Sequence, residues 1–200
     1  MFIERCVTNL SEAKQAVAEG ANRLELCSAL ELDGLTANRE EFLDIKQNLE
    51  VPVRVMLRNS HPGFDVSERE LGELQADADW FKSHGADGFV FGFAGCGAID
   101  VAATLNLLSH CAPLPCTFHK AFDTCLSLTN SLESLIEWRF SSVLTSGGAK
   151  TASAGAEKLA SLVAQAAGRI EVIVAGKVRQ DNLLALNSSI KGSHYHYRVE

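Results

Sequence analysis

Short apolar runs alternate with amphipathic stretches along the whole chain, and this alternation predicts the secondary structure. Each apolar run spans five to seven residues and ends at polar residues or glycines, which is typical of a buried strand. Eight runs are predicted as strands: residues 2–7, 23–27, 51–57, 88–93, 116–122, 142–148, 171–176 and 193–197.

Helical patterns fill the intervals between these runs. Ser67 followed by Glu70 resembles a capping box, and Gly20 and Gly85 stand where two helices are expected to end. Strands that alternate with helices predict a parallel sheet with right-handed crossovers. The predicted helices run from 11 to 20, near 39–48, from 67 to 85, from about 100, and near 127–138, 152–167 and 180–189.

Eight strands alternating with helices in 200 residues predict a (β/α)₈ barrel of the TIM type, formed by one domain over residues 1–200. The competing fold is an open, doubly wound sheet, but the first predicted turn, at residues 7–13, lacks a glycine-rich dinucleotide fingerprint. The sequence stops about three residues after the eighth predicted strand, so we expect the last helix to be missing. Apolar surface left uncovered there predicts a homo-oligomer.

The composition narrows the classes of function. With 18 Lys and Arg against 25 Asp and Glu, the net charge is −7, which disfavours nucleic acids and anionic membranes as partners. No run approaches the roughly 18 apolar residues of a membrane span, and Glu4 and Arg5 interrupt the first run too early for a signal peptide. We therefore expect a cytoplasmic protein whose six cysteines are free thiols.

Chemically active side chains gather at the ends of the predicted strands, where barrels carry their function. Residues two positions apart share a face of a strand, and charged groups are rarely buried unless they are paired. These side chains therefore predict either a paired polar network or a site for a small anion. The set expected to point inward is Glu4, Cys6, Glu25, Cys27, Arg58, His119 and Asp123.

One hypothesis from this set is an enzyme that acts on a small anionic metabolite by acid/base chemistry. Arg58 would anchor the anion, and a carboxylate would share proton transfer with His119, whose ordinary pKa lies near neutrality. The alternative for His119 is a core histidine bonded to a neighbouring strand. The candidate catalytic residues are His119, Glu4, Glu25 and Asp123.

Two further motifs have both a binding and a structural interpretation. Ser146, Gly147 and Gly148 precede a predicted helix, so their N–H groups could bind an anion, or the turn could simply need glycine at positive φ. His194 and His196 share one face of the last strand, and this spacing can bind Zn²⁺ or Cu²⁺. The alternative for the histidines is a frayed terminal strand with exposed rings.

Seven segments stand at predicted strands or strand ends, at residues 4–7, 23–27, 33–36, 55–58, 85–92, 117–123 and 144–148. Together, and in this order, they resemble the CutC family, named for copper homeostasis. The resemblance implies a (β/α)₈ barrel and a link to copper handling, and it brings no accepted enzymatic reaction.

The chain also departs from the family pattern. After Arg58 the family usually shows Pro-Arg and then Gly-Asp-Phe, whereas residues 59–65 here read Asn-Ser-His-Pro-Gly-Phe-Asp. The Gly-Gly-Gly that follows the seventh strand in the family is reduced to Ala-Gly-Lys at residues 175–177. A further hypothesis is therefore a degraded, non-catalytic member that keeps the fold.

The implied copper link directs attention to sulfur, because Cu(I) prefers thiolate and thioether ligands. Cys6 and Cys27 occupy matching positions on neighbouring predicted strands, so their sulfurs are expected to lie close together, with Met56 as a third candidate. The alternative is that both thiols pack as small apolar side chains. The other cysteines show no metal-ligand spacing: Cys96, Cys111, Cys116 and Cys125. The leading hypothesis is a copper-homeostasis barrel that binds Cu(I) through Cys6 and Cys27.

Overall fold

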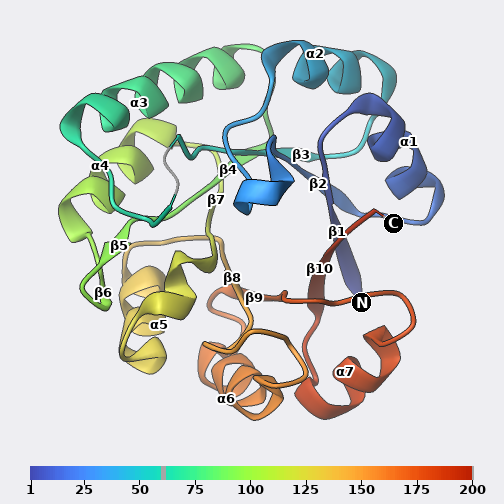
Figure 1. The fold of residues 1–200 in the computed structure, drawn as a ribbon, viewed down its shortest axis with the longest axis vertical. Coiled ribbons are helices and arrows are strands. Elements are labelled where there is room, and N and C mark those ends of the chain that lie inside the picture. Colours follow the sequence, from blue (N-terminus) through green and yellow to red (C-terminus); the bar gives the residue numbers. More distant parts are fainter. Residues whose placement is uncertain (60–61, 200) are drawn as a thin grey trace.

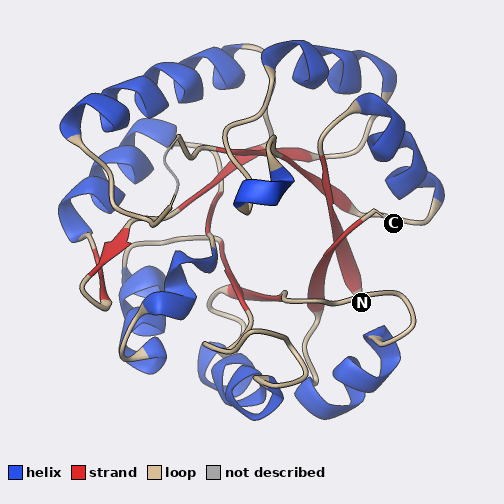
Figure 2. Cartoon of the chain, viewed as in Figure 1, coloured by secondary structure: helices blue, strands red, loops and turns tan. Residues whose placement is uncertain are grey.

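A computed structural model describes residues 1–59 and 62–199, and it shows a closed barrel of eight parallel strands (Figures 1 and 2). Ser60 and His61, part of the run that departs from the family pattern, lie outside the described residues. The barrel strands are β1 (Phe2–Val7), β2 (Arg23–Leu26), β3 (Val53–Met56), β4 (Gly88–Phe91), β7 (Cys116–Phe118), β8 (Ser142–Thr145), β9 (Glu171–Val174) and β10 (His194–Arg198).

Helices surround the barrel on its outer side, as Figure 2 shows. They are α1 (Leu10–Ala18), α2 (Arg39–Asn48), α3 (Glu68–Ser83), α4 (Val101–Cys111), α5 (Leu128–Glu137), α6 (Ala156–Ala166) and α7 (Leu183–Ile190). Within the described residues no helix follows β10. The (β/α)₈ prediction is confirmed, and the open-sheet alternative is wrong.

The barrel closes because the last strand pairs with the first. Their parallel register joins five residue pairs, among them Glu4 with His196 and Cys6 with Arg198. On its other side β1 pairs with β2, placing Cys6 opposite Glu25. Strand β10 is therefore held on both sides, by β1 and β9, and is not a frayed end.

Local capping sets where the helices begin. The Ser67 and Glu70 capping box is present at the start of α3, and Asn38 accepts hydrogen bonds from the first turn of α2. The helix expected from Ser11 begins one residue earlier, because Asn9 accepts from the backbone N–H of Glu12. The helices expected near 152 and 180 begin later, at Ala156 and Leu183.

The fifth predicted strand, 116–122, is shorter in the structure. It ends at Phe118, and a 3₁₀ turn, η2 (Lys120–Thr124), replaces its second half. The cause is local, because His119 caps the turn by accepting a hydrogen bond from the backbone N–H of Ala121. The short hairpin β5 (Ala94–Gly95) and β6 (Ala98–Ile99), which the apolar pattern does not predict, packs against η2.

The outer face of the barrel where β1 and β10 pair is less exposed than the missing last helix predicts. The outward side chains Arg5, Tyr195 and Tyr197 are buried, with exposed fractions of 2%, 0% and 7%. Arg5 pairs with Glu19 at 2.7 Å and its guanidinium lies 4.4 Å from the Tyr197 ring centre. The expected apolar exposure is therefore not found at these residues. Assembly into a homo-oligomer stays a prediction, and light scattering at micromolar protein tests it.

Candidate functional site

A cavity of about 560 Å³ opens at the carboxyl ends of the barrel strands. This is the end where barrels of this type carry their function. The cavity brings together most of the predicted site residues, although Glu4 is not among the side chains that line it. The predicted residues that line it are Cys6, Glu25, Cys27, Met56, Arg58, His119 and Asp123.

The two predicted thiols are in direct contact. The Sγ atoms of Cys6 and Cys27 lie 3.2 Å apart, and the side chains are 4% and 1% exposed. Met56 and Val90 complete a small apolar cluster with them. The expectation that the sulfurs lie close together is confirmed, although Cys6 is in register with Glu25 and Cys27 lies two residues further along the chain.

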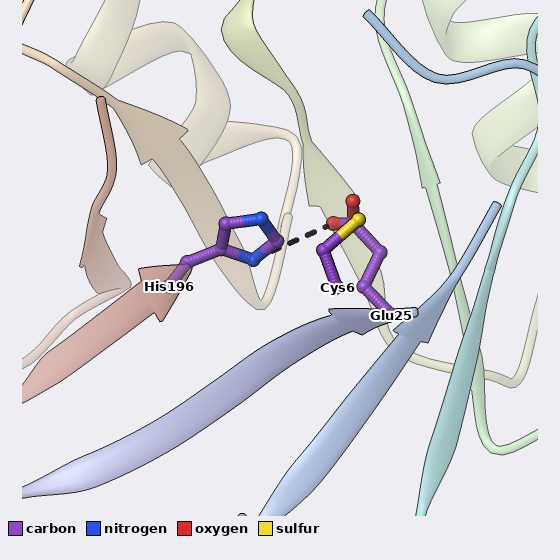
Figure 3. Close-up of side chains that lie close together, drawn as sticks. All are labelled: Cys6, Glu25 and His196. Atoms are coloured by element: carbon purple, nitrogen blue, oxygen red, sulfur yellow. Dashed lines mark ion pairs between the residues drawn. The ribbon is translucent and has the colours of Figure 1, made fainter. Parts of the chain in front are cut away.

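An imidazole and a carboxylate face the Cys6 thiol. Cys6 Sγ, a Glu25 oxygen and a His196 ring nitrogen all lie within 4.8 Å of one another. Figure 3 shows these side chains converging from β1, β2 and β10. The buried Glu25 Oε2 atom makes no hydrogen bond with the described residues, but it forms an ion pair with His196 Nδ1 at 4.0 Å, which Figure 3 marks with a dashed line.

Glu4 lies deeper in the barrel and acts as the counter-charge of the cluster. It accepts hydrogen bonds from Arg23 Nε at 2.6 Å and from His196 Nδ1 at 2.8 Å. Burial alone would raise the pKa of Glu4, but the His196 hydrogen bond and the Arg23 charge outweigh it and hold the pKa at about 2. Glu4 is therefore ionised at neutral pH and fixes the orientation of the His196 ring.

The pKa values of Glu25 and His196 are raised, whereas the pKa of Glu4 is lowered. Burial raises the pKa of Glu25 to about 7, and the neighbouring Glu4 charge adds to this effect. Burial alone would lower the pKa of His196, but Glu25, a hydrogen bond with Cys6 and the contact with Glu4 together raise it well above its ordinary value. His196 is therefore an imidazolium at neutral pH.

The Cys6 thiol is protonated at neutral pH. Its hydrogen bond with Cys27 raises its pKa well above the ordinary range, and burial adds to the effect. Thiolate is the form of cysteine that binds metals. A metal ion that binds Cys6 must therefore displace a proton, and binding is expected to strengthen as the pH rises.

His119 differs from the sequence expectation. Burial and the nearby Arg58 charge lower its pKa from the ordinary value near neutrality to about 3, so it is a weaker base than its residue type alone indicates. The ring accepts a hydrogen bond at Nδ1 from the backbone of Ala121, which assigns the proton to Nε2. That Nε2–H is buried and has no partner among the described residues, so His119 is a neutral donor in the wall of the cavity.

Arg58 ties three loop carbonyls to the cavity wall. It donates to the backbone oxygens of Leu32, Gly34 and Gly63, each at 3.1 Å, and lies over the Phe64 ring. Its buried Nε has no hydrogen-bond partner among residues 1–59 and 62–199. Arg58 thus holds the loops after β2 and β3 and keeps one donor unused.

Asp123 closes the Ser146–Gly148 turn from within the chain. Its carboxylate accepts hydrogen bonds from the Thr145 hydroxyl, from the backbone and hydroxyl of Ser146 and from the Gly148 N–H. Of the N–H groups expected to hold an external anion, those of Ser146 and Gly148 are therefore bound to this internal carboxylate, and that of Gly147 donates to the Thr145 hydroxyl. Gly147 and Gly148 both have φ near +73°, which satisfies the conformational reason for glycine at this turn.

Replacing Asp123 with alanine is expected to destabilise the barrel by about 2–4 kcal/mol, because it leaves several donors around the turn unsatisfied. Urea unfolding monitored by fluorescence measures this change. Asp44→Ala on the exposed surface of α2 is the matched control and is expected to change stability little. Equal effects from the two variants would contradict the assigned role of Asp123.

The residue that sequence analysis undervalued is His196. The sequence predicts His194 and His196 as a metal-binding pair. In the structure the two rings have different acidic neighbours: His196 contacts Glu4, whereas His194 lies 3.7 Å from Glu171. The signal that could have found it is barrel closure, which sets the last strand against Glu4 of the first. Arg23 and Arg54, also missed, neutralise the acidic interior.

The fold and cavity define a (β/α)₈-barrel protein with a buried site of thiols, imidazole and carboxylate. A family model described as the CutC family matches residues 1–198, and the chain belongs to that family. The human copper homeostasis protein cutC homolog is 37% identical over 98% of this chain and 72% of its own length. The Caenorhabditis elegans homolog of the same name is 34% identical over 97% of this chain and 78% of its own.

Solved structures agree with this assignment. The copper homeostasis protein CutC of Streptococcus agalactiae has a TM-score of 0.94 at 25% identity, and each chain covers 100% of the other. Phosphoribosylanthranilate isomerase of Thermotoga maritima, at 14% identity and a TM-score of 0.62 over 99% of this chain and 87% of its own, shares the fold alone. Among the described residues no helix has the length and apolar character needed to cross a membrane.

Proposed function

We propose that this protein handles copper by binding one Cu(I) ion in the cavity through Cys6 and Cys27. The observation that carries the proposal is the direct contact of two buried thiols, 3.2 Å apart, in the wall of a cavity. Relatives of the chain are named for copper homeostasis, which gives the thiols a candidate cargo. Sulfur ligands favour Cu(I) over harder divalent ions.

The surroundings of the thiols fit a soft metal ion. Met56 packs against both cysteines and places a thioether in the same cluster. His196 supplies an imidazole close to Cys6, which can act as a ligand once its proton is lost or as a hydrogen-bond donor to a bound thiolate.

The thiols must rearrange slightly to hold an ion between them. A metal–thiolate bond is about 2.3 Å long, so two sulfurs on one ion stand farther apart than two sulfurs in a hydrogen bond. The neighbouring Gly34 provides room, since a methyl group built on it would still lie 3.6 Å from the Cys27 sulfur. Loss of two thiol protons accompanies binding.

An anaerobic Cu(I) titration of the reduced protein against a competing chelator tests the proposal. We expect one ion per chain, and we expect Cys6→Ser/Cys27→Ser to weaken the affinity by at least about 100-fold, because both soft ligands are lost. The wild type is also expected to bind more tightly as the pH rises from about 6 to 8, since the thiols must be deprotonated.

A second pair of thiols supplies the matched control. Cys111 and Cys116 are also neighbours and buried, but they do not line the cavity. Cys111→Ser/Cys116→Ser is expected to keep the wild-type stoichiometry and affinity, with circular dichroism confirming that both variants fold. Unchanged Cu(I) binding by the Cys6 and Cys27 variant would overturn the proposal.

The location and the enzymatic alternative also remain proposals. A reducing compartment such as the cytoplasm keeps adjacent thiols free, and all six cysteines are free here. An acid/base enzyme acting on a small anionic metabolite is supported by two buried cavity residues. His119 Nε2 has no hydrogen-bond partner among the described residues, and Glu25 Oε2 makes no hydrogen bond with them and lies 4.0 Å from His196 Nδ1. Such an enzyme needs a site for the anion, and the charges at the cavity mouth point to one.

A further inference from the structure

The cavity is strongly cationic although the chain is acidic. Six of the 18 Lys and Arg side chains line it, against three of the 25 carboxylates. One of those carboxylates, Asp123, is already bound to the 145–148 turn, and Glu25 lies at the His196 cluster. The cationic residues are Arg58, Lys120, Lys150, Lys177, Arg179 and Arg198.

Three of these cations have no acidic partner. Within residues 1–59 and 62–199, no carboxylate forms an ion pair with Lys120, Lys150 or Lys177. Most surface lysines of an acidic chain find a carboxylate nearby or point into solvent, whereas these three face one cavity. Lys150 and Lys177 are exposed and Lys120 is half-buried, and like charges that line one concave space strengthen its attraction for an anion.

The loops that carry the cations lie against one another. Lys150 follows β8, and Lys177 and Arg179 follow β9. The backbone N–H of Ala152 donates to the carbonyl oxygen of Gly176 at 2.7 Å, which joins the two loops. The basic residues of these two loops therefore line the same cavity from neighbouring positions in the fold.

Two buried side chains add donors to these basic residues. His119 is 4% exposed and Arg58 is 6% exposed. In the part of the chain that the structure describes, neither His119 Nε2 nor Arg58 Nε has a hydrogen-bond partner. Both residues line the same cavity as the lysines. Buried polar groups without a partner are rare in native proteins and indicate a missing hydrogen-bond acceptor.

We propose that the cavity binds a phosphorylated small molecule, with its phosphate held by Lys150, Lys177 and Arg179 and its polar remainder near His119. In (β/α)₈ barrels the loops after the seventh and eighth strands frequently bind phosphate, and β9 is the seventh barrel strand here. The cavity volume of about 560 Å³ suits a small metabolite. The Ser146–Gly148 turn takes no part, because Asp123 occupies it.

A phosphate is favoured over a single carboxylate by the number and kind of charges. Lysine binds phosphate as a point charge and arginine adds directed donors, so several cations around one group match a dianion with three acceptor oxygens. This inference is independent of the copper proposal, because it uses different side chains and needs no metal.

Isothermal titration calorimetry on the metal-free, reduced protein tests it with four probes: inorganic phosphate, ribose 5-phosphate, ribose and succinate. We expect saturable binding of both phosphates, tighter for the ester, and no binding of ribose. Lys150→Gln/Lys177→Gln is expected to weaken ribose 5-phosphate binding at least about 10-fold, and added salt is expected to weaken it in the wild type.

Lys14→Gln/Lys158→Gln is the matched control, because it removes the same charge from exposed positions on α1 and α6. It is expected to leave binding within about 2-fold of the wild type. The inference is overturned if neither phosphate saturates, if the control weakens binding as much as the cavity variant, or if succinate binds as tightly as ribose 5-phosphate. Because copper is absent throughout, neither result bears on the thiol site.

Discussion

Replacing Glu4 with alanine is expected to destabilise the folded barrel by about 3–5 kcal/mol. The change leaves the buried charges of Arg23 and His196 without their counter-charge, and breaking one side of a buried ion pair is costly for this reason. Urea unfolding near neutral pH measures the loss.

A surface ion pair provides the comparison. Glu73→Ala removes the exposed partner of Arg69 on α3 and is expected to leave the free energy of unfolding nearly unchanged. The wild type should also lose stability in acid as Glu4 is protonated, because its pKa of about 2 lies below its ordinary value of 4.5. A loss below about 1 kcal/mol for Glu4→Ala would contradict the assignment of Glu4 as the central counter-charge.

Replacing Glu25 with glutamine is expected to change the pH dependence of stability. The folded protein binds the Glu25 proton more tightly than the unfolded chain, because burial raises the pKa from 4.5 to about 7. This contribution to stability is complete below about pH 4.5 and is lost as the pH rises through about 7, a difference of about 3 kcal/mol. The glutamine variant has no carboxyl group and avoids the loss.

Unfolding free energies of the wild type and Glu25→Gln, measured between about pH 4.5 and 8, test this expectation. The stability of the variant relative to the wild type should increase across that interval, while His196 keeps its contact with Glu4. Glu31→Gln, at an exposed position, is the control and should show no such trend. A difference that does not vary with pH would show that Glu25 is not protonated by burial.

Much of the fold could be predicted because the alternation of apolar runs with amphipathic stretches follows the order of the strands and helices. The eight strands appear in the expected order, and period-two alternation correctly predicts that Cys6 and Cys27 meet across neighbouring strands. The strand ending at Phe118 is shorter than expected because the His119 side chain caps a turn, a local contact that an apolar pattern does not reveal.

The chemistry of the site could be predicted less well, because it depends on contacts between distant strands. Glu4 and Glu25 look equivalent in sequence, yet the Arg23 contact and the His196 hydrogen bond lower one pKa while burial raises the other. His119 loses its expected basicity through burial, and Asp123 fills the turn that looked open to an anion. His196 becomes central only when the barrel closes.

The most direct test of the central claim is X-ray absorption at the copper K-edge of the Cu(I)-loaded, reduced protein. The account predicts at least two sulfur neighbours per copper at about 2.3 Å, and their loss in Cys6→Ser/Cys27→Ser. A copper ion surrounded by nitrogen and oxygen alone, or a sulfur shell unchanged in that variant, would contradict the account and remove Cys6 and Cys27 from the site.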